Sequence, residues 1–213
     1  ITKALALDPD NYEMLKDECF IYYLKKDFAK ATEKGKVLIE KPEADVQAFQ
    51  ILGMTYKELA LYKDCRKLYK RALTKFPNSG VIYNDAGELL DMDNDHAEAI
   101  VMWENGMAKD ANYSNNYYNA VKFYATSKDP DLFWIIFVGE NFVNLESYTA
   151  RTTEIKKILL EAYKKLYLNS DLLAAYKDKK IGNFERDVLT TLNKSASVAN
   201  DGITPENIMA IKT

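Results

Sequence analysis

The chain has 213 residues, 47% of them hydrophobic and 29% charged, and a net charge of −3, a composition ordinary for a globular protein. A charge so close to balance provides no overall field that would draw the chain to nucleic acid or to an anionic membrane. Its 8 glycines and 5 prolines are too few for the turns of a sandwich or barrel of short strands, so we expect an all-α fold.

A repeat of 34 residues organises the chain from Tyr12 onward. Units start at Tyr12, Val46, Gly80 and Ser114 without insertions. The second unit has large, small and closing residues at fixed positions, namely Phe49, Leu52, Gly53, Tyr56, Cys65, Tyr69, Ala72 and Pro77. This pattern resembles the tetratricopeptide repeat family. The resemblance implies an α-solenoid of antiparallel helix pairs, a superhelix in that family.

Small residues recur where the two helices of a unit must approach each other. They are Cys19, Gly53 and Gly87 in the first helices and Ala31, Cys65 and Ala99 in the second. Aromatic residues fill the space between pairs, so truncation of Tyr56 or Tyr69 is expected to cost about 3 to 5 kcal/mol. Gly35 stands where a bulky aromatic is expected, which predicts looser packing of the second helix in the first unit.

We expect three segments along the chain. Residues 1–11, including Ala4 and Leu5, match the end of a preceding repeat and predict an array that continues upstream. Residues 12–145 hold the four units, of which the fourth diverges after about Tyr124. Residues 146–213 form a helical extension that we expect to be cut short. The run from Gly139 to Glu146, with Arg151 and Thr152 after it, resembles an extension that follows the repeats in some bacterial tetratricopeptide proteins.

Helices are predicted in the extension from apolar spacing and start signals. Apolar residues between Arg151 and Leu168 recur at three and four residues, which indicates an amphipathic helix. Ser170 and Asp171 are expected to begin a helix through Lys177. Another helix is expected from Phe184 to Leu192, followed by a loop over 195–202. Thr204 and Pro205 then form a helix-start signal.

No stretch is predicted to cross a membrane. The longest apolar run, Leu132 to Gly139, is far shorter than the roughly 18 residues that a spanning helix needs. The cellular compartment stays open, because a chain that begins at Ile1 gives no view of an export signal.

Few residues could carry catalysis or bind a metal. The single histidine, His96, occupies a packing or turn position, and Cys19 and Cys65 are expected to be buried structural thiols. Glu140 and Glu146 are six residues apart and fall on different faces of a helix. We therefore expect no enzyme, no cofactor and no metal site.

Lysines cluster at 156–157, 164–165 and 177–180, but amphipathicity alone places lysines opposite an apolar stripe. Glu154 and Glu161 dilute them. We therefore do not expect nucleic-acid binding.

The family resemblance implies a concave groove lined by the first helix of each unit. Aromatic residues and methionine beside amides and lysines can hold a peptide there. The predicted partner-binding residues are Lys16, Phe20, Tyr23, Gln50, Met54, Lys57, Asn84, Glu88, Asp91, Asn115, Tyr118 and Lys122. The alternative is that these side chains form a solvated inner face that binds nothing.

Some family members clamp the terminal carboxylate of chaperone peptides. Lys16 matches the first lysine of that clamp, but its other four positions hold Phe20, Ile51, Val81 and Asp85, so we expect no such ligand. The sequence thus predicts a non-catalytic module that binds a protein or peptide partner, whose identity stays open. A structural assembly subunit, packed on itself or on other domains of a longer chain, is the alternative.

Overall fold

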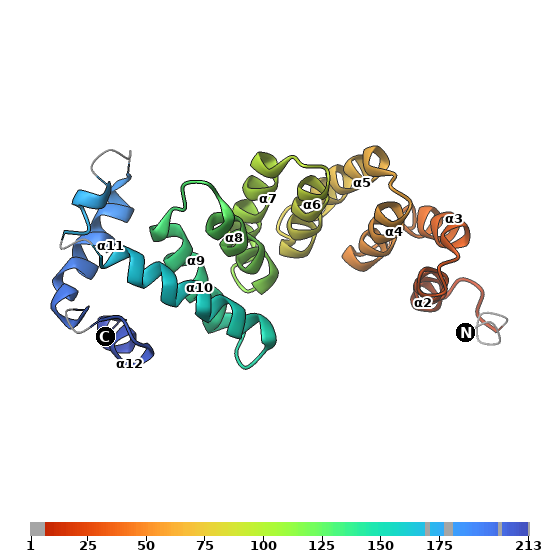
Figure 1. The fold of residues 1–213 in the computed structure, drawn as a ribbon. Helices are drawn as coiled ribbons and strands as arrows, with labels where there is room; N and C mark the ends of the chain where they lie inside the picture. The colour runs from red at the N-terminus through yellow and green to blue at the C-terminus, as the bar shows by residue number, and fades with distance from the viewer. Residues whose placement is uncertain (1–6, 169–170, 177–180, 200–201, 213) are drawn as a thin grey trace. The chain divides into compact units, whose positions relative to one another are not determined.

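A computed structural model describes residues 7–168, 171–176, 181–199 and 202–212 (Figure 1). The part it describes is helical, which confirms the all-α prediction. The chain divides into two compact units, residues 1–116 and 117–213, and each is described by itself. Ala4 and Leu5, at the expected end of a preceding repeat, lie outside the described residues, as do Ser170 and the 177–180 lysine cluster.

Unit 1 consists of three helix pairs followed by the first turn of a further helix. From α2 to α7, helices that are neighbours in the chain pack on each other, and α4 also packs on both α2 and α6. The helices are α2 (Tyr12–Leu24), α3 (Phe28–Leu38), α4 (Val46–Glu58), α5 (Tyr62–Lys75), α6 (Gly80–Met92), α7 (His96–Lys109) and the start of α8 (Ser114–Thr126).

Side-chain caps explain where the first helices of the pairs begin. The side chains of Asn11, Asp45 and Ser79 accept hydrogen bonds from backbone N–H groups three residues further on, at 3.1, 2.9 and 3.3 Å. Each cap satisfies an amide that the helix itself leaves unpaired. The residue after each cap is a start position of the 34-residue repeat, so local chemistry and the repeat agree on these boundaries.

A glycine of one helix lies against an aromatic residue of the next in the second and third pairs. A Cβ atom on Gly53 would lie 2.2 Å from the Tyr69 hydroxyl, and one on Gly87 would lie 2.3 Å from the Trp103 indole nitrogen. Tyr69 and Trp103 are 1% and 4% exposed. The missing side chain of each glycine is therefore the space that the aromatic ring occupies.

In the first pair the glycine lies on the second helix instead of the first. Gly35 is on α3, and Cys19 occupies the corresponding position on α2. Gly35 is buried against Leu52 of α4, whose Cδ1 would lie 3.1 Å from an added Cβ. The prediction of loose packing at Gly35 is wrong, because a leucine from the next pair fills the space of the absent aromatic.

Both cysteines are buried and free, as expected for structural thiols. Their Sγ atoms lie 3.3 Å from the Ala31 carbonyl oxygen and 3.5 Å from the Gly53 carbonyl oxygen. Burial raises the pKa of each thiol to about 11. Neither thiol is poised to act as a nucleophile at neutral pH.

Unit 2 contains most of α8 and the helices that follow. They are α9 (Leu132–Leu145), α10 (Ala150–Leu166), the 3₁₀ turn η1 (Ala174–Tyr176), α11 (Asn183–Lys194), the 3₁₀ turn η2 (Ala196–Ala199) and α12 (Pro205–Lys212). Helices α9 and α10 pack closely, and a Cβ on Gly139 of α9 would lie 2.8 Å from Leu159 of α10.

The divergence of the fourth repeat reflects two additional residues in one turn. One 34-residue step beyond His96 is Pro130, whereas α9 begins two residues later, at Leu132. The spacing from the start of α9 to the start of α10 equals the spacing from α7 to α8. Helix α10 therefore follows α9 as the first helix of a fifth pair would, shifted by two residues.

Two details of the extension differ from the sequence expectations. The described residues 171–176 form a turn and the 3₁₀ turn η1 rather than the start of an α-helix, and Asp171 caps it by accepting from the Leu173 amide at 3.0 Å. The expected loop over 195–202 contains η2. The expected start signal at Thr204 is confirmed, since its hydroxyl accepts a hydrogen bond from the Asn207 amide at 3.3 Å. Throughout the described ranges, no helix is both long and apolar enough to cross a membrane.

Tyr69 provides a test of the packing between helices. Its hydroxyl is buried beside the Cys65 thiol and has no hydrogen-bond partner of ordinary geometry among the described residues. We expect Tyr69→Ala to lower the free energy of unfolding by about 3 to 5 kcal/mol, because it leaves a cavity. Tyr69→Phe keeps the ring and is expected to change it by less than about 1 kcal/mol. Urea denaturation of both variants measures the difference, and equal losses would contradict this account.

Candidate functional site

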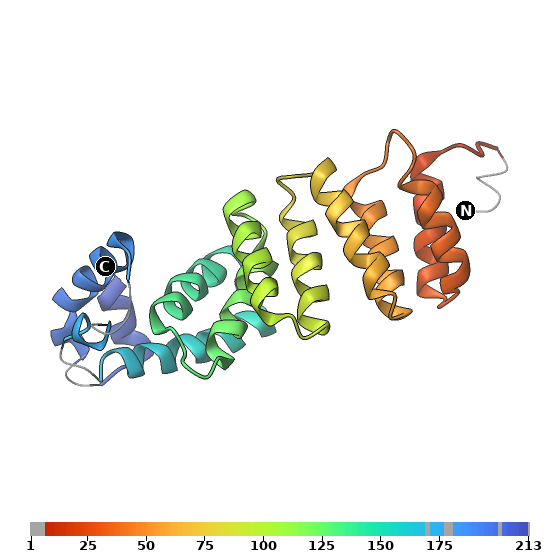
Figure 2. The same ribbon diagram turned by 90° about the horizontal axis from the view of Figure 1, so that it is seen from above.

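The predicted binding residues of unit 1 lie on stripes of α2, α4 and α6, which we call the inner face. The stripes are Lys16, Phe20 and Tyr23 on α2; Gln50, Met54 and Lys57 on α4; and Asn84, Glu88 and Asp91 on α6. Residues four and seven apart share one side of a helix. Figure 2 shows the helices of this unit side by side in chain order.

Lys16 is buried at the junction of α2 and α4. Its side chain is 6% exposed, and its Nζ lies 2.5 Å from Asp45 and 3.1 Å from Glu13. Burial lowers the pKa of Lys16, but the hydrogen bonds to the two carboxylates outweigh burial and the net pKa is raised. Lys16 therefore joins two helices rather than offering a free cation to a ligand.

Gln50 links α4 to α6 through a buried carboxylate. Its Nε2 donates to Oδ2 of Asp85 at 3.0 Å, and Asp85 is 7% exposed. Burial raises the pKa of Asp85 to about 6, although Lys57, Gln50 and Asn84 favour its charged form. Asp85 adjoins the expected Asn84 in sequence, and reading the sequence alone missed its role.

Lys57 and Asn84 both contact Glu88. The Lys57 Nζ lies 3.3 Å from Oε2 of Glu88, and the Asn84 Nδ2 donates to Oε1 at 2.9 Å. Asn84 is 1% exposed. The polar residues in the middle of the inner face are thus bonded to one another across the helices.

The aromatic and sulfur-containing residues of the inner face remain half-buried. The Phe20 and Tyr23 rings stack with centroids 6.1 Å apart and planes inclined by 12°. Phe20 and Met54 also pack against the core of the unit. These side chains present apolar surface beside fixed polar groups.

Two further predicted residues of unit 1 are hydrogen-bonded to residues close to them in the sequence. Oδ1 of Asp91 accepts a hydrogen bond from Nδ1 of His96 at 2.7 Å, and both side chains are exposed. His96 is the first residue of α7 and is exposed, so it does not occupy the packing position that was one of its two expected places. Asn115 donates to the Tyr113 hydroxyl at 2.9 Å.

The predicted residues Tyr118 and Lys122 belong to unit 2, where they contact α10. The Tyr118 hydroxyl donates to Glu154 at 2.6 Å, and Lys122 lies 3.4 Å from the same carboxylate. Arg151 lies over the Tyr118 ring, 4.8 Å from its centroid. The link from Tyr118 to Glu154 spans 36 residues and resembles that from Gln50 to Asp85, which spans 35.

The carboxylates Asp45, Asp85 and Glu154 each bond a predicted residue of a neighbouring helix, a role that the sequence analysis did not assign to them. Asp45 was visible as a helix cap directly before the Val46 repeat start, whereas Glu154 was obscured by the two-residue shift. Glu146, considered as half of a carboxylate pair, is instead bonded to Arg151. Among the described residues, no group of three or more histidine, cysteine, aspartate or glutamate side chains is placed to hold a metal ion.

No protein-family model and no curated protein matches the chain. Solved structures do match. A tetratricopeptide repeat protein from Parabacteroides merdae is 14% identical, with a TM-score of 0.57 over 94% of this chain and 84% of that chain. The MamA protein is 20% identical, with a TM-score of 0.52 over 87% of this chain and 89% of that chain. The chain therefore has the tetratricopeptide-repeat fold.

The buried carboxylate of Asp85 predicts a pH dependence of stability. Its pKa of about 6 in the folded state lies above the roughly 3.9 of an unfolded chain. The folded protein therefore binds this proton more tightly, and stability that is full below about pH 4 is lost as the pH rises through about 6.

We expect Asp85→Asn to raise the free energy of unfolding by about 1 to 3 kcal/mol at pH 7.5 and to change it little at pH 4. Asp17→Asn, on the exposed surface of α2, is the matched control. Urea denaturation at both pH values provides the measurement. The account of Asp85 fails if both variants show the same pH response.

Proposed function

We propose that the chain is a non-catalytic protein-interaction module that binds an extended peptide or a partner helix on the inner face of unit 1. The observation that carries this proposal is the half-buried group of Phe20, Tyr23 and Met54 beside polar side chains. Partly exposed aromatic and methionine side chains are enriched where proteins bind each other. The repeat fold offers such residues on adjacent helices.

Bonds between the helices support the proposal because they fix the face before a partner arrives. Gln50 is held by Asp85, and Lys57 by Glu88. Binding to side chains that are already ordered costs less conformational entropy than binding to free ones. We therefore assign the apolar contacts to Phe20, Tyr23 and Met54, and the orientation of the ligand to the polar residues around them.

The same bonds argue against a terminal carboxylate as the ligand. Lys16 is the one residue that matches the carboxylate clamp, and its ammonium group is buried between Asp45 and Glu13. A carboxylate would have to displace Asp45 from both Lys16 and the start of α4. A peptide bound here is held along its length instead.

The test is a double substitution, Tyr23→Glu with Met54→Glu. Partners are first recovered from source cells with the tagged whole chain, and their affinities are then measured by calorimetry. We expect the double variant to bind at least about tenfold more weakly, because two apolar contacts become charged. Val101→Glu on α7, where Val101 is 41% exposed, is the control. Circular dichroism confirms that the variants fold, and undiminished binding by the double variant would contradict the proposal.

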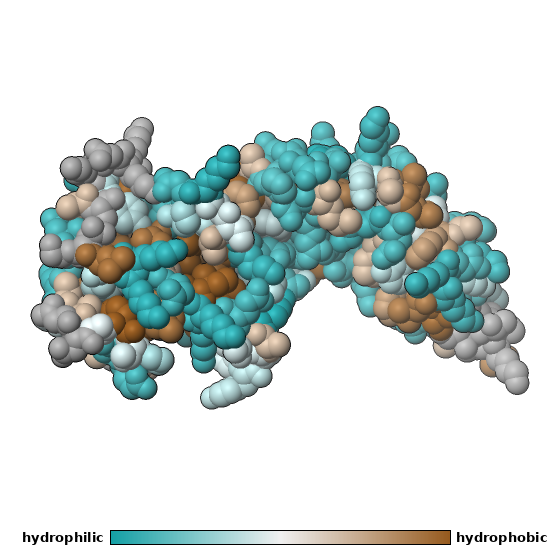
Figure 3. Space-filling model, viewed as in Figure 1, coloured by the Kyte–Doolittle hydropathy of each residue, from teal (hydrophilic) through white to brown (hydrophobic). Residues whose placement is uncertain are grey.

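A structural role in assembly is the second candidate, favoured by exposed apolar residues in unit 2. Phe137, Phe184 and Met209 are 37%, 49% and 61% exposed. Figure 3 shows apolar residues gathered over the region of α9 to α12. Light scattering over a range of concentrations separates the two candidates, since self-assembly requires a mass that rises with concentration.

A further inference from the structure

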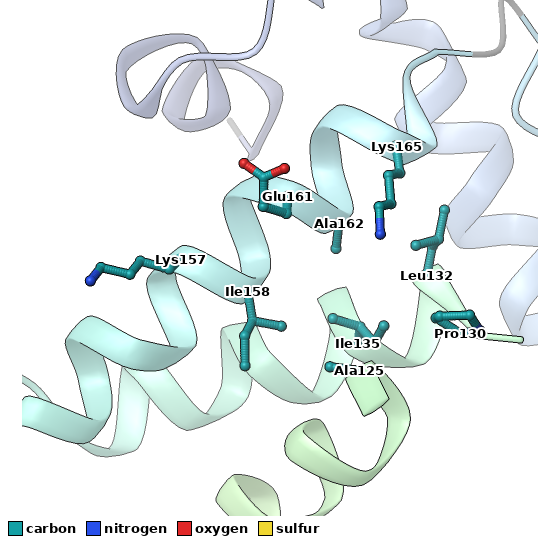
Figure 4. Close-up of a pocket in the computed structure, with 9 residues that line it drawn as sticks. All are labelled: Ala125, Pro130, Leu132, Ile135, Lys157, Ile158, Glu161, Ala162 and Lys165. Atoms are coloured by element: carbon teal, nitrogen blue, oxygen red, sulfur yellow. The ribbon is translucent and has the colours of Figure 1, made fainter. Parts of the chain in front are cut away.

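Unit 2 has an apolar pocket between α8, α9 and α10 (Figure 4). Its volume is about 300 Å³. Its apolar lining consists of Ala125, Pro130, Leu132, Ile135, Ile158 and Ala162. Pockets for drug-sized ligands occupy about 300 to 1,000 Å³, so this one is at the lower limit. Its size suits one or two side chains of a larger partner.

The charged residues at the mouth of the pocket are mainly basic. Lys157 and Lys165 line it and are exposed, and within the described part of the chain neither forms an ion pair. Glu161 also lines it, but its carboxylate is paired with Lys164 at 2.8 Å. In Figure 4 the Glu161 carboxylate points away from Leu132 and Ile135, whereas the Lys165 side chain extends toward them.

The nearby Asp131 caps α9 and, among the described residues, forms no ion pair with Lys157 or Lys165. Its Oδ1 accepts the Phe133 amide at 3.1 Å and the Tyr176 hydroxyl at 3.3 Å. An apolar cavity with unpaired ammonium groups at its edge is complementary to an apolar side chain flanked by carboxylates.

We infer that this pocket binds a bulky apolar side chain of a partner protein, within an acidic segment whose carboxylates contact Lys157 and Lys165. The inference rests on the proposed function, because it assumes that the chain binds proteins. It adds a second contact site in unit 2 and specifies the chemistry of the segment that occupies it. The pocket gives affinity through burial of the anchor side chain, and the two lysines give preference for acidic neighbours.

Selection from a phage-displayed library of random peptides of about 12 residues, with the whole chain as target, tests the inference. We expect selected peptides to share one bulky apolar residue between aspartates or glutamates. A synthetic copy of the strongest binder is then measured by fluorescence polarisation at physiological salt. The double variant Lys157→Glu and Lys165→Glu is expected to bind it at least about tenfold more weakly, and to bind an analogue with lysines in place of the acids.

Two further variants separate pocket binding from general charge. Ala125→Trp fills the cavity without changing charge and is expected to weaken binding by a similar factor. Lys156→Glu with Lys194→Glu makes the same change of charge at exposed residues of unit 2 that do not line this pocket, and is expected to change affinity by less than about threefold. Circular dichroism verifies folding in each case.

Several outcomes would overturn the inference. If the selected peptides lose binding to Tyr23→Glu with Met54→Glu but not to the pocket variants, unit 1 binds proteins and the pocket does not. If no peptide is selected and dodecanoate binds in a Lys165-dependent way, the pocket takes a small anionic amphiphile. If Ala125→Trp abolishes a concentration-dependent dimer, the occupant is a second copy of the chain. If no protein or peptide binds at all, the proposed function fails as well.

Discussion

The close approach of two helices within a pair is the constraint on which unit 1 depends. Gly53 and Gly87 have no side chain to separate the helices, so Tyr69 and Trp103 can lie directly against backbone. Each aromatic is thereby buried, and its burial supplies much of the hydrophobic free energy of its pair. Once every pair has nearly the same width, successive pairs can stack at a constant spacing. The stacking then brings the first helices into contact, which places Lys16 near Asp45 and Gln50 near Asp85.

These polar contacts have a cost as well as a benefit. Asp85 is almost fully buried, and removing a carboxylate from water is unfavourable unless its partners compensate. Gln50, Asn84 and Lys57 compensate only in part, as the raised pKa of Asp85 shows. Apolar residues of similar size could provide stability at this position without such a penalty. The polar network instead fixes how one helix pair is placed against the next.

Much of the fold could be predicted from the sequence, because glycines, aromatics and helix caps recur at a fixed spacing. The starts of α2, α4, α6 and α8 follow directly from this period. The packing around Gly35 could not be predicted, because Leu52, which fills the space, belongs to the next pair. The candidate site was harder still. The position of a residue within the repeat indicates which side chains share a face of a helix. It does not indicate that Lys16 forms an ion pair with Asp45, or that Asn84 is almost inaccessible to solvent. Those facts depend on contacts across about thirty residues, which no local pattern encodes.

The two additional residues between α8 and α9 show where chain length can vary in this architecture. Within an α-helix, two more residues would rotate everything beyond them by about 200° and turn the buried face toward solvent. In a turn they leave the helix faces unchanged, and the register resumes from Leu132 to Ala150. The turn between α8 and α9 can thus change in length without changing which side chains of the two helices face the core. A change in the length of this turn is therefore compatible with the helix faces on both sides, as long as Pro130 and the cap residue Asp131 keep their places before α9.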